Sequence, residues 1–175
     1  MEALIREKMK SSLSDSDLIA MTEGKCNVYE YKDILQFDNI DQMLQPFGCC
    51  IILYETAERF GHYTAVLKQG NTIEFFDSLA LKPDWQLLFV DKKKRKHLGE
   101  EKPHLTYLML DSPYKLIYNK WKFQKFDKNV STCGRWVALR ICLNYIPLKK
   151  FQQLFKNQPK SPDYYVTAMT LALIQ

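Results

Sequence analysis

A cysteine at the expected start of an apolar helix is the feature of this sequence best suited to chemistry. It lies in the run Ser131-Thr132-Cys133-Gly134-Arg135-Trp136, where two hydroxyl residues that can cap the helix precede it. The first N–H groups of a helix lack partners within the helix, and the helix dipole is positive at that end. This position favours a thiolate and offers donors to a developing oxyanion. Taken alone, Cys133 is better interpreted as a structural cysteine that begins a core helix.

A reactive thiol also needs an imidazole, and one of the three histidines has suitable surroundings. His97 and His104 flank a basic segment in polar sequence, whereas His62 follows Gly61 at the start of a β-rich segment. A strand end of this kind would hold the ring against the core and open to a cleft. His62 is therefore the candidate partner of Cys133.

Asp77 is the candidate group that orients the imidazole. It ends the β-rich segment after His62, and the two residues lie eight positions before and seven positions after Gly70. An antiparallel hairpin turning near Gly70 would make them near neighbours across the ladder. A paired carboxylate raises the pKa of an imidazole and fixes its tautomer. Each residue alone has an ordinary structural interpretation, but the three together indicate a Cys-His-Asp site.

The elements that must position these residues follow the order helices, strands, helices. Helices are expected at residues 3–11, 18–21, 38–44, 133–144, 148–155 and 161–174. Strands are expected at residues 49–54, 61–67, 72–78, 105–110 and 121–126, and residues 85–90 fit either type. This order predicts an α+β fold with helices packed on a mixed, mainly antiparallel sheet.

Length and composition favour one domain, residues 1–175, because 175 residues with 46% hydrophobic residues support one substantial core. The excess of 25 basic over 20 acidic side chains permits nucleic-acid binding without requiring it. The only compositionally unusual segment is basic and is expected to form a loop: Asp91, Lys92, Lys93, Lys94, Arg95 and Lys96. It is either a solvated surface loop or a polyanion contact.

The five cysteines are odd in number and have no C-x-x-C spacing, which argues against a disulfide framework and against a zinc or other metal site. The first residues lack the apolar core of a signal peptide, and no apolar run approaches the ~18 residues that span a bilayer. We therefore expect a soluble protein in a reducing, intracellular environment, neither secreted nor bound to a membrane.

The ordered set of motifs resembles the adenain-like branch of the cysteine protease clan that includes SUMO-deconjugating proteases. The matching strings are Gly61-His62-Tyr63, Phe76-Asp77-Ser78 and Thr132-Cys133-Gly134-Arg135-Trp136. The form of the last string and the small size look most like maturation proteases of large DNA viruses, virophages and polinton-type elements. The resemblance implies a papain-like or adenain-like fold. It also implies an endopeptidase that processes capsid or core precursors, in the virion or at an assembly site in the host cell.

In the family that this chain resembles, a glutamine six or seven residues before the cysteine donates to the oxyanion. Those positions hold Asp127 and Phe126, neither of which can donate an amide. Gln124, nine residues before Cys133, is therefore the expected donor, with Asn129 as second choice.

Tyr63 and Trp136 are the aromatic residues expected to line the substrate groove. The resemblance implies narrow subsites beside the cysteine that accept small residues such as glycine. DNA, contacted by residues 92–96, or an activating peptide could serve as a cofactor, and none is otherwise required. We expect a monomer.

Two other functions are open from sequence alone. An isopeptidase that removes ubiquitin-like modifiers would use the same residues, since the clan includes both activities. Alternatively, the chain could be a non-catalytic DNA-binding virion protein in which the basic segment carries the function.

Overall fold

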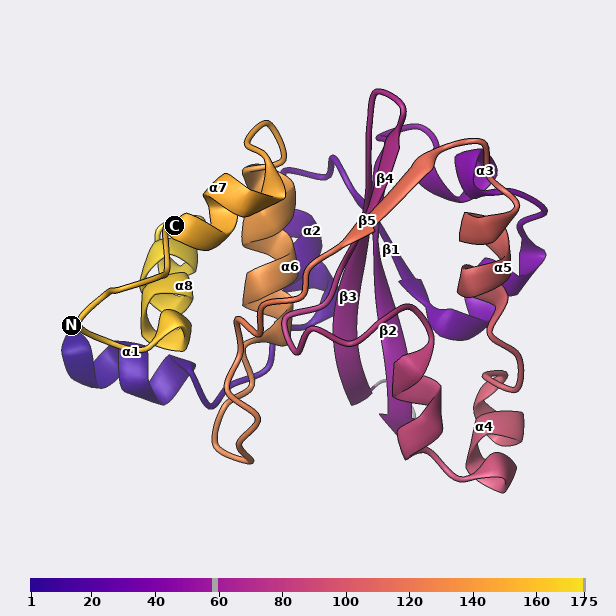
Figure 1. Ribbon diagram of the computed structural model, residues 1–175. Helices are drawn as coiled ribbons and strands as arrows, with labels where there is room; N and C mark the ends of the chain where they lie inside the picture. The colour runs from indigo at the N-terminus through magenta and orange to yellow at the C-terminus, as the bar shows by residue number, and fades with distance from the viewer. Residues whose placement is uncertain (58–59, 175) are drawn as a thin grey trace.

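A computed structural model describes residues 1–57 and 60–174, and a twisted sheet occupies its centre (Figure 1). The strand order is β1 (Asn27–Glu30), β2 (Cys49–Ala57), β3 (Phe60–Gln69), β4 (Thr72–Phe76) and β5 (Lys115–Tyr118). Strands β2, β3 and β4 are antiparallel neighbours, whereas β1 is parallel to β2 and β5 is parallel to β4. The predicted α+β class with a mixed central sheet is confirmed.

Helices cover both faces of the sheet (Figure 1). One layer contains α1 (Glu2–Lys8), α2 (Asp15–Met21), α6 (Cys133–Cys142), α7 (Leu148–Gln153) and α8 (Pro162–Leu171). The other contains two 3-10 helices, η1 (Tyr31–Gln36) and η2 (Trp85–Phe89), with α3 (Ile40–Leu44), α4 (Lys92–Leu98) and α5 (His104–Leu110). A separate hydrophobic cluster fills each interface. Among the described residues, no helix is long and apolar enough to cross a bilayer.

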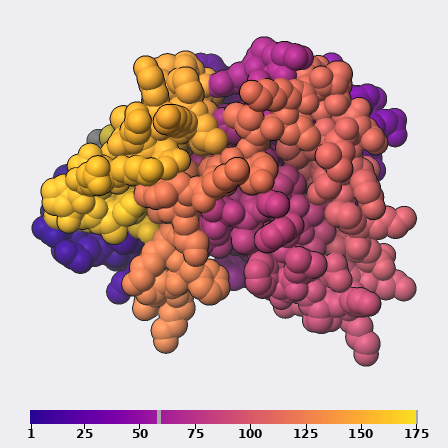
Figure 2. Space-filling model, in the orientation of Figure 1, coloured from indigo at the N-terminus to yellow at the C-terminus, as the bar shows by residue number. Residues whose placement is uncertain are grey.

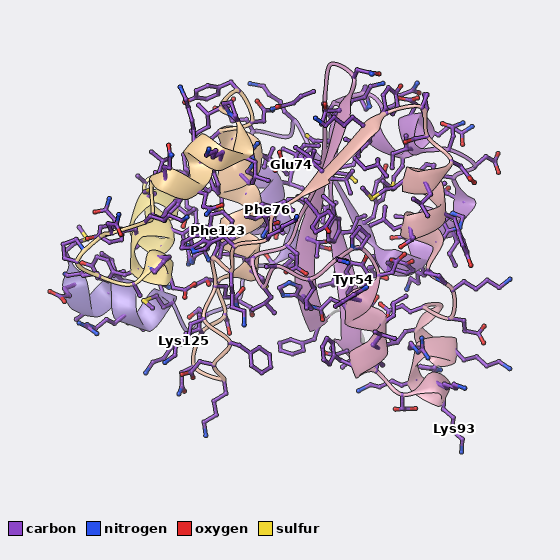
Figure 3. The ribbon with its side chains drawn as sticks, in the orientation of Figure 1. Tyr54, Glu74, Phe76, Lys93, Phe123 and Lys125 are labelled. Atoms are coloured by element: carbon purple, nitrogen blue, oxygen red, sulfur yellow. The ribbon has the colours of Figure 1, made fainter. Side chains whose placement is uncertain are left out.

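The helix that begins at Cys133 is fixed firmly on the sheet. Phe123 packs between Phe76 and Trp136; its ring centroid lies 5.2 Å from that of Phe76 and 5.1 Å from that of Trp136. Phe76 and Phe123 are labelled beside this helix in Figure 3. Further along α6, the guanidinium of Arg140 donates two hydrogen bonds to the buried carboxylate of Glu74, at 2.8 and 2.9 Å. Because such a bidentate pair fixes orientation as well as distance, it sets the direction of α6 across β4.

The β3–β4 hairpin forms as the sequence predicts. Gln69 pairs with Thr72 around Gly70, whose φ of 55° is accessible to glycine without a Cβ penalty. The last ladder pair is Ala65 with Phe76, so β3 continues beyond β4 and pairs there only with β2. The N-terminal part of β3, including His62, therefore has one edge that β4 leaves uncovered.

Two expected strands are absent from the structure. Residues 105–110 belong to helix α5, because Leu105, Leu108 and Met109 form a buried stripe at helical spacing. Residues 121–126 adopt no regular element, although Phe123 is buried. The outer strands β1 and β5 were not expected from the sequence, and residues 85–89 form the 3-10 helix η2.

The basic segment is helix α4 rather than a loop. The side chain of Asp91 accepts a hydrogen bond from the Lys94 N–H at 3.0 Å, and Gly99 ends the helix with a φ of 74°. These N-terminal and C-terminal caps outweigh the repulsion among like charges in so short a helix. In Figure 3, Lys93 points away from the body of the molecule.

Candidate active site

His62 and Asp77 meet beside the open end of β3. The His62 Nε2 atom lies 2.8 Å from the Asp77 Oδ1 atom, and both residues are buried. Continuation of the ladder would set Asp77 opposite Thr64, so His62 is its diagonal neighbour. The expectation that a hairpin brings the two together agrees with this arrangement, with an offset of two residues.

Backbone contacts hold the Asp77 carboxylate in place. Its Oδ1 atom accepts a second hydrogen bond from the Leu79 N–H at 2.7 Å. The side chain of Asn119 accepts from the Asp77 N–H at 3.0 Å and donates to the Asp77 carbonyl at 2.6 Å. Asn119 is itself buried, so this pair of bonds connects the end of β4 to the chain after β5. No local sequence signal predicts this role of Asn119, because its contact with Asp77 spans 42 positions.

Gly61 allows the approach of β3 to β2 immediately before His62. A Cβ atom at position 61 would lie 1.8 Å from the Tyr54 carbonyl oxygen and 2.8 Å from the Glu55 Cα atom. Only glycine fits such a backbone contact. The glycine of the Gly-His-Tyr motif therefore fixes the backbone that carries the imidazole.

Cys133 is the first residue of α6, is largely buried and lines a cavity. Burial would raise the pKa of the thiol, but the hydrogen bond and charge of His62 and the backbone groups of Tyr63 and Gly134 outweigh this effect and lower the pKa. Burial would likewise lower the pKa of His62, but the charges and hydrogen bonds of Asp77 and Cys133 raise it to about 10. Both directions favour a thiolate beside an imidazolium.

The expected hydroxyl cap of this helix does not form. Thr132 is the N-cap residue, but its side chain makes no capping bond and donates instead to Asp163 Oδ1 at 2.5 Å. The N–H groups of the first turn thus have no side-chain cap beside the thiol. This arrangement suits the binding of an oxyanion.

The cavity beside Cys133 measures about 430 Å³, within the range of about 300 to 1,000 Å³ that is typical of ligand sites. His62, Cys133 and Gln124 line it together with residues of the irregular segment 125–131. That segment belongs to the orange lobe that projects from the lower edge of the molecule in Figure 2. Phe60 and Phe126, both largely exposed, also border the cavity.

Gln124 lines the cavity, whereas Asn129 does not. The Gln124 Oε1 atom accepts from the Ser78 hydroxyl at 2.7 Å, which turns the amide nitrogen toward the loop, where it lies 3.4 Å from the Val130 carbonyl. One N–H of that amide remains for a ligand in the cavity. Asn129 is exposed and does not border the cavity.

The two aromatic candidates differ in their surroundings. Tyr63 is buried against the start of α6, donates to Asp15 Oδ1 at 2.5 Å and lines a neighbouring hollow formed by residues 12–17. Trp136 is fully buried and donates its indole N–H to Asp163 at 3.0 Å. Trp136 therefore belongs to the core and does not border the cavity, in contrast to the expectation from sequence.

The basic residues lie apart from the cavity. Lys92, Lys93, Lys94 and Lys96 are exposed on α4, whereas Arg95 is partly buried and its Nε atom has no partner among the described residues. Figure 3 places Lys93 far from Lys125, which stands on the segment that lines the cavity. No group of three or more His, Cys, Asp or Glu side chains in residues 1–57 and 60–174 is arranged to hold a metal ion.

Comparison with solved structures agrees with the fold expected from the motifs. The ASFV pS273R protease superposes with a TM-score of 0.52 at 13% identity, over 94% of this chain and 68% of that chain. Two other solved structures are more distant. ChlaDub1 from Chlamydia trachomatis has a TM-score of 0.44 at 14% identity, over 93% of this chain and 78% of that chain. The SUMO protease Ulp1 has a TM-score of 0.42 at 12% identity, over 95% of this chain and 80% of that chain. The chain thus shares the fold of the ASFV pS273R protease.

Sequence comparison identifies a relative of nearly the same length. No family model matches the chain. The "Uncharacterized protein V9" of Sputnik virophage is 33% identical over 167 residues, which cover 93% of this chain and 95% of the relative. The chain belongs to the same family as this virophage protein.

Proposed function

We propose that this chain is a cysteine endopeptidase, acting as one domain, with Cys133 as nucleophile and His62 as its acid and base. The observation that carries the proposal is the position of His62. Its Nε2 atom is bound to Asp77, so Nδ1 is the ring nitrogen left to interact with the Cys133 thiol. An imidazole held between a carboxylate and a thiol at a helix start is the arrangement that thiol proteases need.

In the first half of the reaction, the Cys133 thiolate adds to the carbonyl carbon of the scissile bond. The electron pair of the carbonyl moves to oxygen and forms a tetrahedral oxyanion. Protonated His62 then gives its proton to the amine nitrogen, the C–N bond breaks, and a thioester remains on Cys133. Asp77 stabilises the imidazolium and holds its tautomer throughout.

In the second half, neutral His62 takes a proton from a water molecule that adds to the thioester. The second tetrahedral oxyanion collapses, the C–S bond breaks and the thiolate is restored beside the imidazolium. The N–H of Cys133 and the side-chain amide of Gln124 would stabilise both oxyanions. Such donors act most strongly in a site that excludes water.

We propose precursors of capsid or core proteins as the substrates, cleaved in the virion or at its assembly site. The family relationship to a virophage protein and the fold shared with a viral protease support this substrate class. The exposed lysines on α4 are proposed to contact viral DNA, because four positive side chains on one short helix present a concentrated charge. DNA binding is tested by measuring affinity against salt concentration: each phosphate contact should add about −0.9 to the slope of log affinity against log salt.

The test uses a candidate capsid or core precursor and purified protein. Wild type should cut the precursor at discrete sites, and Cys133→Ala should abolish cleavage while leaving the fold intact by circular dichroism. Cys142→Ala is the matched control, because Cys142 lies on the same helix and burial raises the pKa of its thiol. Undiminished cleavage by Cys133→Ala would refute the assignment. Cleavage only of a ubiquitin-like C-terminal tail would replace the endopeptidase by an isopeptidase.

A further inference from the structure

We infer that Asp163 is a positioning residue that holds both oxyanion donors in register, an inference that rests on the proposed function. Asp163 lies in the first turn of α8 and is 1% exposed. Neither the family motifs nor the candidate triad includes it. Its carboxylate nevertheless accepts hydrogen bonds from the chain just after Gln124 and from the start of α6.

The first contact fixes the chain immediately after Gln124. The N–H of Lys125 donates to Asp163 Oδ2 at 2.9 Å. The adjacent Gln124 N–H donates to the Ser78 carbonyl at 2.9 Å, so both peptide groups around the candidate donor are held. Because Gln124 has no helix or strand to position it, these bonds define where its side chain begins.

The second and third contacts fix the start of α6. Thr132, the residue before Cys133, donates its hydroxyl to Asp163 Oδ1 at 2.5 Å. One turn later, the Trp136 indole N–H donates to the same oxygen at 3.0 Å. The two oxygens of one buried carboxylate thus bind opposite ends of the irregular segment that separates Gln124 from Cys133.

This arrangement determines the distance between the Gln124 side-chain amide and the Cys133 N–H, which must both bind the oxyanion of the substrate. The segment between them has no regular secondary structure, and its exposed residues supply little packing of their own. An error of about 1 Å in the position of a reacting or stabilising group can cost about 10²-fold in rate. Asp163 acts on the donors through Lys125 and Thr132 and does not itself reach the cavity.

Asp163→Asn tests the inference, because an amide keeps the volume but replaces one acceptor by an N–H₂ group. At least one of the three groups that donate to Asp163, from Lys125, Thr132 and Trp136, then faces another hydrogen-bond donor. We expect kcat for precursor cleavage to fall about 30- to 100-fold, with KM changed less than about 3-fold, since the lost positioning acts on the transition state. The rate of Cys133 alkylation by iodoacetamide should change less than about 3-fold, because alkylation needs the thiolate and no oxyanion site.

Asp84→Asn is the matched control for loss of a buried carboxylate. Asp84 accepts from the Tyr31 hydroxyl, the Tyr54 hydroxyl and the Thr106 N–H at 2.8, 2.9 and 2.7 Å, on the other face of the sheet. The Asp84→Asn variant should destabilise the fold without changing kcat per folded molecule. If Asp163→Asn does not fold, Thr132→Val should reproduce the kcat loss, whereas Thr132→Ser, which keeps the hydroxyl, should not.

Hydrogen exchange separates this inference from the proposed function. In Asp163→Asn, the Lys125 amide should exchange at least about 10-fold faster, while the amides of β2 and β3 stay protected as in wild type. That result would support the positioning role even if the wild type cleaves no precursor. An unchanged Lys125 amide, an unchanged kcat, or equal losses of kcat and alkylation would overturn it.

Discussion

The imidazole of His62 and the carboxylate of Asp77 meet diagonally across the β3–β4 hairpin, with Nε2 2.8 Å from Oδ1. The offset arises because β4 ends at Phe76, so Asp77 turns away from the ladder and its Oδ1 atom also accepts from the Leu79 N–H. Asp77 is thereby fixed by its own turn and holds the imidazole in one orientation. The ring nitrogen that remains faces the start of α6, where the thiol lies.

Gln124→Ala should lower the rate of precursor cleavage by about 10²- to 10³-fold, mainly in kcat, because one oxyanion donor is lost. Alkylation of Cys133 should be nearly unchanged, since His62 and the backbone groups of Tyr63 and Gly134 are what lower the pKa of the thiol. Asn129→Ala, an exposed position on the same segment, serves as the control and should cleave normally. A large kcat loss in Asn129→Ala with a normal Gln124→Ala would reverse the choice of donor.

Gly61→Ala should disrupt the site through the backbone. The added methyl would meet the Tyr54 carbonyl and the Glu55 Cα, so β3 must shift where it carries His62. We expect the free energy of unfolding to fall by roughly 3 kcal/mol and cleavage to be lost. Gly70→Ala, on the turn of the same hairpin with open space around it, should cost only about 1 kcal/mol through its positive φ and should retain activity. Urea unfolding and cleavage assays on both variants measure the difference.

Glu100→Gln should stabilise the protein at neutral and higher pH. Burial, and then the charge of Glu55, raise the pKa of Glu100 to about 7, against the hydrogen bond from the Glu55 N–H and the charge of Arg95. The folded state therefore keeps a proton that the unfolded state loses between about pH 4.5 and 7, and wild-type stability falls as the pH rises through that range.

The glutamine variant keeps the acceptor for the Glu55 N–H and has no charge to bury. Its advantage over wild type should be near zero at pH 4 and about 2 kcal/mol at pH 8, measured by urea unfolding at each pH. An advantage that is the same at both pH values would show that titration of Glu100 is not its cause.

The hairpin and the helix at Cys133 could be predicted because their signals are local. Gly70 marks the turn, and apolar segments on each side bring His62 and Asp77 into reach. The strand that the sequence predicts at residues 105–110 is wrong, because a short apolar run fits both strand and helix. The burial of Leu105, Leu108 and Met109 against the sheet selects the helix, and only tertiary contacts reveal that.

The supporting residues of the site could not be predicted, because their partners are distant in the sequence. Asn119 contacts Asp77 across 42 positions, and Asp163 contacts Thr132 across 31. Trp136 was expected in the groove from its place beside Cys133, but a position three residues along a helix faces the core as readily as the cleft. Sequence proximity to a nucleophile therefore does not predict contact with substrate.

The ionisation of Cys133 tests the central claim most directly. An unperturbed thiol with a pKa near 8.5 is only about 3% ionised at pH 7. We predict that wild type is alkylated by iodoacetamide with an apparent Cys133 pKa well below that value. His62→Ala should raise the pKa and slow alkylation at pH 7 by about 10-fold or more. Mass spectrometry of the peptide containing Cys133, followed from pH 4 to pH 10, gives both profiles. Identical profiles in wild type and His62→Ala would contradict the thiolate–imidazolium pair and, with it, the proposed mechanism.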